Sequence, residues 1–479
     1  MKLIIFLIIL SALSPLMVST SLAQPITSAE AATVATNWMT LIWQKTGDWS
    51  GVTSPSLASV EEYKRGNRTL GYFCKVNPSG YILVSLLKGL PPITAYSTTC
   101  NLDLNFDEGP GDLIKYWPER VLNQIEKQLG PISTVTPERL RPLLAIDNAE
   151  TWNMLSQSPA NFRTQLENGA IARDYYQGDI LLTSEWHQHE PYNNNCPSDP
   201  DVCDDPHCTV GCVATAAAQI VRYWSWPPGR DFMSMRDYVY SSDSTQWQAA
   251  VAELSSFLGL AVDMNYCEND GCASGAFIVD MEPALEMMSY DPACWVAYRS
   301  DYEDPLGWWG LITSELDANQ PIEYGIPGHA IVCDGYSSVG GQWNYHMNYG
   351  WGGLLDSFNT WYALDNLHYP REGDLSEEKM LLGIKPNFSR GQFGNSTYAG
   401  YSYIDRDFWG SNAHFLAGSR IQFLTHPAVA FRCGTYNVRI DGTPSANSKL
   451  YAIDETQGIK LTNSSIILYP GGGIQMFRE

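Results

Sequence analysis

The sequence predicts an α+β fold in which one buried helix packs against an antiparallel sheet. The helix is expected from about Cys212 to Trp224, where apolar residues recur at helical spacing until Pro227 and Pro228 end the run. The sheet is expected from a hairpin, because residues 328–336 alternate as a strand and residues 343–348 form a second strand after a Gly-Gly turn. With 479 residues, two or three domains are expected.

The chain begins with the features of an export signal. Lys2 precedes an apolar run from Leu3 to about Leu10, and Ser21-Leu22-Ala23 has the small-x-small form of a cleavage site. We therefore expect residues 1–23 to be removed after Ala23 and the mature protein to be secreted or extracytoplasmic. No later run of about 18 apolar residues is present, so no membrane insertion is expected.

Charge and cysteine content limit the partners and the compartment. The net charge of −23 argues against nucleic acid and anionic lipid as partners. Eleven cysteines in an exported chain indicate disulfides, and the odd number leaves at least one thiol unpaired. Spacing does not determine the connectivity. The pairs considered are Cys267 with Cys272, Cys74 with Cys100, and pairs among Cys196, Cys203 and Cys208, while Cys333 and Cys433 are equally compatible with buried free thiols.

Residues 24–170 read as a first domain. Ala31, Ala35, Trp38 and Ile42 mark one face of an amphipathic helix. Strands are expected at 69–76 and 81–86 around the turn 77–80, and helical patterns follow between 112 and 129 and between 149 and 166. No combination of nucleophile, base and oxyanion donor occurs here, which favours a chaperone-like or inhibitory segment.

Two functions compete for the segment Trp186–Asn193 and the cysteine-rich loop after it. His187, His189, His207 and the nearby cysteines could bind zinc, but their spacing matches no regular ligand pattern, and an oxidising compartment favours disulfides. Alternatively, Gln188 donates a hydrogen bond to a developing oxyanion together with the backbone N–H of Cys212. A polar loop residue without a role is the simplest interpretation of Gln188.

Cys212 and His329 are the candidate nucleophile and base. Gly211 allows a sharp turn into the helix, so the Cys212 thiol lies at the helix N-terminus, where the macrodipole lowers a thiol pKa. A small core residue or half of a disulfide is the alternative for Cys212. His329 begins a strand facing this helix end, which is the arrangement that a thiolate–imidazolium pair requires. His346 on the second strand is the rival base.

These motifs resemble the streptopain family of papain-like cysteine peptidases. The resemblance spans about residues 180–387 and a pro region of about 25–130. It rests on Gly211–Ala216 with Gln219-Ile220, Gly328-His329-Ala330, Asn348-Tyr349-Gly350-Trp351-Gly352-Gly353, Trp186–Asn193, Leu382–Pro386 and the strand Gly80–Ser85. It implies a two-lobed papain-like fold of residues 171–387, with a helical lobe against a twisted antiparallel sheet, preceded by an α+β pro-domain.

The resemblance also implies the roles of the site residues. Cys212 is the nucleophile, His329 the general base and then acid, and Gln188 the side-chain donor to the oxyanion. Trp351 matches one tryptophan of the family's Gly/Trp corner, but Tyr349 stands where a second tryptophan is common, so the group that orients His329 is left open between Asn348, Tyr349 and Trp351. The implied enzyme is a zymogen that hydrolyses protein or peptide substrates through a thioester, with its own propeptide as inhibitor and no cofactor or metal.

After Pro386 the sequence changes to short strand-like runs separated by Gly, Pro, Asn and Ser. Residues 388–479 are expected to form a small β-rich domain of unknown role, with strands near 419–424, 436–440, 449–453 and 459–461. Two other function classes are considered for the whole chain. One is a catalytically inactive homologue that acts as a binding or structural protein, and the other is a thiol transpeptidase or amidase on the same scaffold.

Overall fold

The computed structural model describes residues 25–479 with internal gaps. The gaps are 103–109, 145, 171–175, 204, 228–229, 233, 268–271, 303–304, 340–341, 353–359, 364–377, 388–396, 399–400, 405–407, 410–413, 416–419, 424–428, 436–437, 442–448, 453–462, 469–473 and 477–479. The predicted export signal therefore lies outside the described residues.

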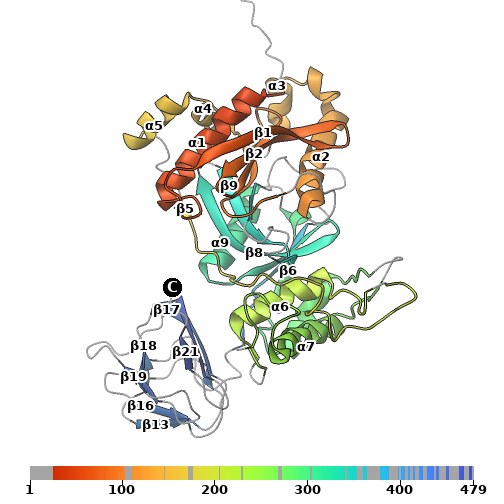
Figure 1. The fold of residues 1–479 in the computed structure, drawn as a ribbon, viewed down its shortest axis with the longest axis vertical. Coiled ribbons are helices and arrows are strands. Elements are labelled where there is room, and N and C mark those ends of the chain that lie inside the picture. Colours follow the sequence, from red (N-terminus) through yellow and green to blue (C-terminus); the bar gives the residue numbers. More distant parts are fainter. Residues whose placement is uncertain are drawn as a thin grey trace, which may run out of the picture.

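One antiparallel sheet of eleven strands runs through the described part of the chain, in the order β1-β2-β3-β4-β10-β9-β8-β7-β11-β6, with β5 beside β8 (Figure 1). The N-terminal strands are β1 (Ser56–Arg65), β2 (Arg68–Asn77), β3 (Tyr81–Ser85), β4 (Ile93–Ser97) and β5 (Tyr176–Gln177). The others are β6 (Trp295–Tyr298), β7 (Ile322–Ile326), β8 (His329–Val339), β9 (Gln342–Asn348), β10 (Thr360–Tyr362) and β11 (Lys379–Leu382).

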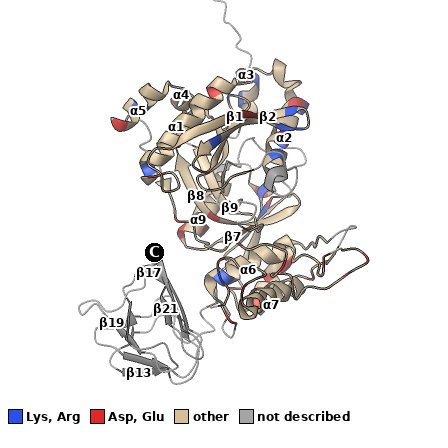
Figure 2. Ribbon diagram, viewed as in Figure 1, with Lys and Arg blue, Asp and Glu red and all other residues tan. Residues whose placement is uncertain are grey.

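The N-terminal half of the sheet is covered by helices that the sequence largely predicts. Helix α1 (Ser28–Thr46) starts at a Thr27/Glu30 capping box, ends at Gly47 in the left-handed conformation, and packs on β1, β2 and β3. Helix α2 (Pro110–Leu129) is tied to β1 and β2 by the Arg65–Glu119 and Arg68–Glu126 ion pairs. Figure 2 shows basic and acidic positions on these elements. The pattern near 149–166 forms two helices, α4 (Ala149–Leu155) and α5 (Pro159–Glu167), because Ser158 caps a new helix with Pro159 in its first turn.

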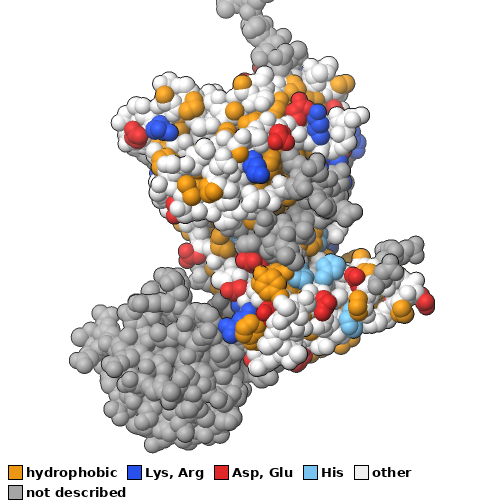
Figure 3. Space-filling view, in the orientation of Figure 1, with side chains coloured by type: hydrophobic (Ala, Val, Ile, Leu, Met, Phe, Trp, Pro, Cys, Tyr) orange, Lys and Arg blue, Asp and Glu red, His pale blue; other side chains and the backbone are white. Residues whose placement is uncertain are grey.

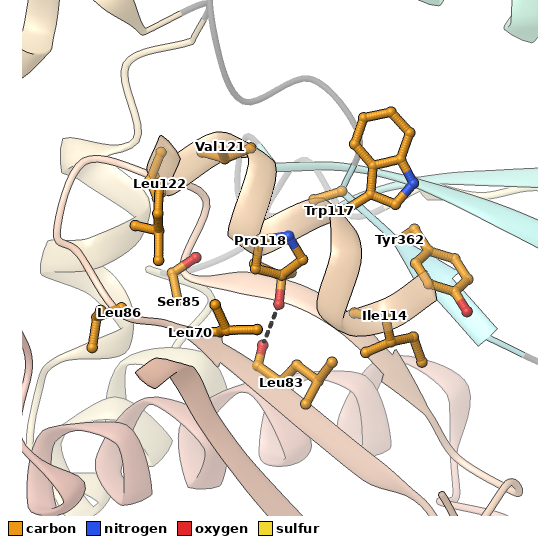
Figure 4. A pocket seen from close by; sticks show the side chains of 14 residues that line it. Leu70, Leu83, Ser85, Leu86, Ile114, Trp117, Pro118, Val121, Leu122 and Tyr362 are labelled. Carbon is orange, nitrogen blue, oxygen red and sulfur yellow. Dashed lines mark hydrogen bonds between the residues drawn. The ribbon is translucent and has the colours of Figure 1, made fainter. Parts of the chain in front are cut away.

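Short helices complete this half: η1 (Ile132–Thr134), α3 (Pro137–Leu140) and η2 (Arg141–Leu143). A mostly apolar pocket lies between α2 and the strands below it (Figure 4). Leu70, Leu83, Ile114 and Trp117 line it, together with Tyr362 of β10. None of the predicted catalytic residues borders this pocket, so it belongs to the N-terminal half and its junction with the rest.

The second half of the sheet packs against a helical lobe. Helix α6 spans Cys212–Trp224, as predicted, and packs on β8, β7 and α7 (Thr245–Ala261). The lobe also contains η3 (Ile278–Asp280) and α8 (Met281–Met287). Helix α9 (Pro305–Asp317) instead packs on β7 and β8 and contributes Trp308, Ile312 and Leu316 to the core of the sheet's other side, and η4 (Arg299–Asp301) precedes it. The α+β class and the papain-like arrangement of helices against an antiparallel sheet are confirmed. No described helix has the length and apolarity to span a membrane.

Only strands are described in the C-terminal part, and they form three small sheets. Their strands are β12 (Thr397–Tyr398), β13 (Tyr401–Ile404), β14 (Phe408–Trp409), β15 (His414–Phe415), β16 (Arg420–Phe423), β17 (Val429–Thr435), β18 (Val438–Asp441), β19 (Lys449–Ala452), β20 (Asn463–Leu468) and β21 (Ile474–Met476). The strands predicted near 419–424, 436–440 and 449–453 are therefore present, and the one at 459–461 lies outside the described residues.

The two halves of the large sheet meet where β4 pairs with β10. Beyond the ladder, the buried side chain of Gln342 on β9 accepts from the Ile93 N–H (3.3 Å) and donates to the Ile93 carbonyl (2.9 Å). The Tyr81 and Thr360 hydroxyls are 3.0 Å apart across the same junction. We call this contact of β3 and β4 with β9 and β10 the seam.

Replacing Gln342 with Leu should destabilise the protein. The change leaves the N–H and the carbonyl of Ile93 without their side-chain partner, and a buried unsatisfied polar group costs about 1–3 kcal/mol. Denaturant unfolding of the Cys212→Ala protein, with and without Gln342→Leu, measures the difference. Exposed Gln44 on α1 is the matched control, and Gln44→Leu should change the stability by less than about 0.5 kcal/mol. Equal effects of the two substitutions would contradict the role of Gln342 at the seam.

Candidate active site

The first residue of α6 is Cys212, and Gly211 before it makes the sharp entry possible. Gly211 has φ +88°, and a Cβ at this position would lie 2.6 Å from the Met264 side chain and 3.2 Å from the Ser274 carbonyl oxygen. Only glycine fits both requirements. The thiol of Cys212 accepts hydrogen bonds from the N–H groups of Val213 and Ala330, so it lies beside the start of β8.

Burial raises the pKa of the Cys212 thiol in this structure, although the backbone hydrogen bonds from Ala330 and Val213 oppose the shift. The lowered pKa expected from the helix N-terminus is therefore wrong for this form of the protein, because desolvation of the thiolate outweighs the helix-end N–H groups. Buried Glu323 on β7 adds to this electrostatic environment. Neither of its carboxyl oxygens has a hydrogen-bond partner, and burial, followed by its interaction with Cys212, raises its pKa well above the usual value.

His329 is the first residue of β8 and is held on two sides. Its Nε2 lies 2.9 Å from the Tyr349 carbonyl oxygen, and its ring stacks on Trp351 at 4.6 Å between centroids and 19° between planes. Because a carbonyl only accepts, Nε2 carries the hydrogen and Nδ1 keeps its lone pair. Burial lowers the pKa of His329 to about 4, against the opposing effect of the Tyr349 carbonyl, so the ring is neutral near pH 7.

The rival base His346 has other partners. It is buried on β9, and its Nδ1 lies 2.6 Å from Oδ1 of Asp334. The thiol of Cys212 instead contacts Ala330, the neighbour of His329. The contacts thus bring His329, rather than His346, to the end of the sheet where α6 begins.

Gln188 lies beside the residues that precede α6. Its carbonyl accepts a hydrogen bond from Val210 N–H (3.0 Å), two residues before Cys212, and the residue itself is half-buried. Asn348 is buried and directed to other groups. Its amide nitrogen donates to the Ser184 carbonyl (2.7 Å) and the Gln219 side chain (3.0 Å), while its oxygen accepts from Gly350 N–H (3.0 Å). Asn348 therefore holds the Gly/Trp corner to α6, whereas Tyr349 and Trp351 contact His329.

Sequence reasoning missed three of these groups. Gln219 was part of a motif without a role, and it links α6 to Asn348 and to the backbone of Trp186. The hydrogen-bond acceptor for His329 is a main-chain carbonyl, which leaves no side-chain signature. Glu323 was also missed, because one acidic residue in a strand pattern gives no sign of burial.

Two disulfides join the loop before α6 to the loop after α7. They are Cys203–Cys272, 69 residues apart in the sequence, and Cys208–Cys267, 59 residues apart. The pairings considered from the sequence are wrong, because they joined cysteines close in the sequence whereas both bonds join distant segments. Cys333 is not disulfide-bonded, nor are Cys74, Cys100, Cys196, Cys212 and Cys294, and Cys433 lies outside the described side chains. In the described part of the chain, Cys203, Asp205 and Cys272 form the only tight group of metal-ligand types, and its two sulfurs are bonded to each other, which speaks against the zinc alternative.

Comparisons with known proteins agree with this geometry. Residues 186–231 and 229–362 match the Peptidase C10 family, and residues 23–123 match the Spi protease inhibitor family. Streptopain of Streptococcus pyogenes is 25% identical over 395 residues, which cover 73% of this chain and 89% of that protein. These matches support a streptopain-family cysteine peptidase.

Two further relatives are similar. The thiol protease/hemagglutinin PrtT of Porphyromonas gingivalis is 26% identical over 409 residues, which cover 76% of this chain but 42% of that protein. A fragment of prointerpain A from Prevotella intermedia has the same fold, with a TM-score of 0.50, 22% identity and coverage of 68% of this chain and 98% of that one. This streptopain-family chain is thus a cysteine endopeptidase made as a zymogen, with an inhibitor-like N-terminal region.

The stability of this zymogen should fall between pH 6.5 and 4. Burial lowers the pKa values of His329 and His187 from 6.5 to about 4, so the unfolded chain binds protons first as the pH falls. Each histidine then costs roughly 3 kcal/mol by pH 4. Denaturant unfolding of Cys212→Ala across this range measures the loss, and adding His329→Gln should make it shallower. Identical pH dependence of the two proteins would contradict the lowered pKa, and so the neutral state, of His329.

Proposed function

We propose that Cys212 is the nucleophile, His329 the base and acid, and Gln188 with the Cys212 N–H the oxyanion site of this peptidase. The observation that carries the proposal is the hydrogen bond from His329 Nε2 to the Tyr349 carbonyl. It leaves the lone pair of Nδ1 as the only site on the ring that can accept the thiol proton. The Tyr349 carbonyl and the Trp351 ring are the groups proposed to orient His329, and Asn348 supports their backbone.

The reaction follows from these roles. Nδ1 of His329 accepts the proton of the thiol, and the sulfur of Cys212 attacks the scissile carbonyl carbon. The oxyanion that forms accepts hydrogen bonds from the Gln188 side chain and from the Cys212 N–H, one of the helix-end N–H groups that lack an intrahelical partner. His329 then protonates the leaving amine, and the thioester is hydrolysed by water that the same ring deprotonates.

The pro region is proposed to keep the enzyme latent through the seam. Tyr81 of the pro region contacts Thr360 of β10, and Tyr362 of the same strand packs its ring 5.3 Å from that of Tyr349. The seam thus supports the residue whose carbonyl binds His329. Removing the pro region would free one edge of β10 and loosen this support, which allows the ring and the thiol to exchange a proton in a wetter site.

The domain boundaries and the cleavage site are part of the same proposal. Residues 1–23 are proposed to direct secretion and residues 24–170 to form the propeptide. The cut is expected in the exposed stretch after α5, because Asn168, Gly169 and Ala170 are exposed, whereas Leu181 and Leu182 are bonded to Asp334 of β8. The catalytic domain would then start near residue 171 and end near 387, followed by the C-terminal module of residues 388–479.

The proposal is tested with the chain lacking residues 1–23 and its Cys212→Ser and His329→Ala variants, incubated in mild reductant. The wild type should shorten to a new N-terminus between about 165 and 181 and gain casein-cleaving activity that iodoacetamide blocks. Neither variant should shorten. Gel analysis and N-terminal sequencing follow the processing, and mixing active wild type with each variant shows whether the variant's propeptide is accessible.

Three results would contradict the proposal. If wild type stays inert after an added protease has removed its pro region, the chain is a binding or structural homologue. If an added amine acceptor diverts most of the product from hydrolysis to a new amide, the enzyme is a transpeptidase on the same scaffold. Processing of Cys212→Ser at the wild-type rate would refute Cys212 as the nucleophile.

A further inference from the structure

His187 lies directly before Gln188 and is one of the few buried histidines in the described residues. It is 8% exposed, and its ring packs edge-on against Tyr192 at 4.6 Å and beside Tyr238 at 5.5 Å. Figure 3 shows histidine side chains on the visible face of the helical lobe. Because buried polar groups are usually hydrogen-bonded, the ring nitrogens of His187 are expected to have partners.

One ring nitrogen of His187 closes a turn around Gln188. Nδ1 accepts a hydrogen bond from the backbone N–H of His189 (3.2 Å). The bond spans Gln188, so it fixes the backbone of that residue from one side. On the other side, the Gln188 carbonyl is bound by Val210 N–H (3.0 Å). These two contacts fix the backbone of Gln188 and therefore the direction in which its side chain leaves the backbone.

The opposite edge of the same ring meets the Gly/Trp corner. A Cβ on Gly352 would lie 2.9 Å from Cδ2 of His187 and 3.1 Å from Cε2 of Tyr238, so the Gly352 backbone rests directly on these rings. Gly350, two residues earlier, rests on Thr215 of α6 in the same way, with 3.1 Å between its Cβ position and Cγ2. Trp351, which stacks on His329, is thus held between α6 and His187.

We propose that His187 is a positioning residue that aligns the oxyanion donor Gln188 through its Nδ1 and the base His329 through Gly352 and Trp351. The inference rests on the roles of Gln188 and His329 in the proposed function. It makes one imidazole the shared support of two groups that act on opposite sides of the reacting carbonyl, and such groups tolerate little displacement.

The environment of His187 keeps its Nδ1 available as an acceptor. Burial, and then the nearby His189, lower its pKa to about 4. The titratable groups around the ring are His189, Tyr192 and Tyr238, and the Glu185 carbonyl borders the same space at Gly352. The ring therefore stays neutral over the range in which a thiol peptidase works, and Nε2 carries its hydrogen.

Two substitutions separate the two contacts. His187→Phe keeps a ring against Gly352 but has no acceptor for His189 N–H. His187→Asn places a carbonyl oxygen near the position of Nδ1 but removes the ring. His189→Asn is the matched control, because the side chain of His189 is exposed while its backbone N–H, which the bond uses, is unchanged.

The enzyme matured from the full-length chain is assayed for kcat and KM on a chromogenic peptide, with active sites titrated. The pH profile of Cys212 alkylation by iodoacetamide is measured on the same preparation. His187→Phe should lower kcat by about tenfold or more, with KM and the alkylation profile unchanged, because alkylation needs no oxyanion donor. His187→Asn should shift the alkylation profile towards that of an isolated thiol. His189→Asn should resemble the wild type.

The proposal is overturned if His187→Phe keeps kcat within about twofold of the wild type, or loses kcat and alkylation rate by the same factor, as general loosening would. It is also overturned if the alkylation profile of His187→Asn equals that of the wild type. His187→Gln, whose amide cannot reach the Nδ1 position, replaces the phenylalanine variant if that protein does not fold. A wild type without thiol-dependent activity would instead refute the proposed function itself.

Discussion

The hydrogen bond between His329 Nε2 and the Tyr349 carbonyl is the contact on which the proposed chemistry depends. It assigns the ring hydrogen to Nε2 and so leaves Nδ1 for the thiol. A backbone carbonyl can do this only if its own peptide is held rigidly. Here the glycine corner is pinned by Asn348, by α6 under Gly350 and by His187 under Gly352. The local folding of residues 348–352 is therefore part of the site.

The second constraint is that pro region and catalytic domain share one sheet. Pairing of β4 with β10 adds the pro-region strands to the edge of the catalytic strands, so the inhibitor-like region is bound by main-chain hydrogen bonds and by Gln342 and Tyr81 at the seam. In this state the pKa of the Cys212 thiol is raised and the pKa of His329 is lowered. Both shifts favour a neutral thiol and a neutral imidazole over the ion pair, so desolvation offers a physical basis for latency.

Much of this could be predicted from the sequence, and the remainder has identifiable physical reasons. Helix α6 was predictable because its apolar run is bounded by Gly211 and by the prolines at 227 and 228, and the β8–β9 hairpin because its alternation flanks a Gly-Gly turn. The disulfides and the β4–β10 pairing join distant segments, which local patterns do not encode. The thiol pKa was mispredicted because helix-end N–H groups are visible in a sequence, whereas burial is not.

The most direct test of the central claim is the rate of Cys212 alkylation by iodoacetamide as a function of pH, before and after removal of the pro region. In the zymogen, the rate should rise only as the pH approaches the raised pKa of the half-buried Cys212 thiol and should barely change with His329→Ala. After maturation, a reactive plateau should extend into the acidic range and disappear with His329→Ala. A zymogen that already shows this His329-dependent plateau would contradict the account, because the ion pair would then exist with the pro region in place.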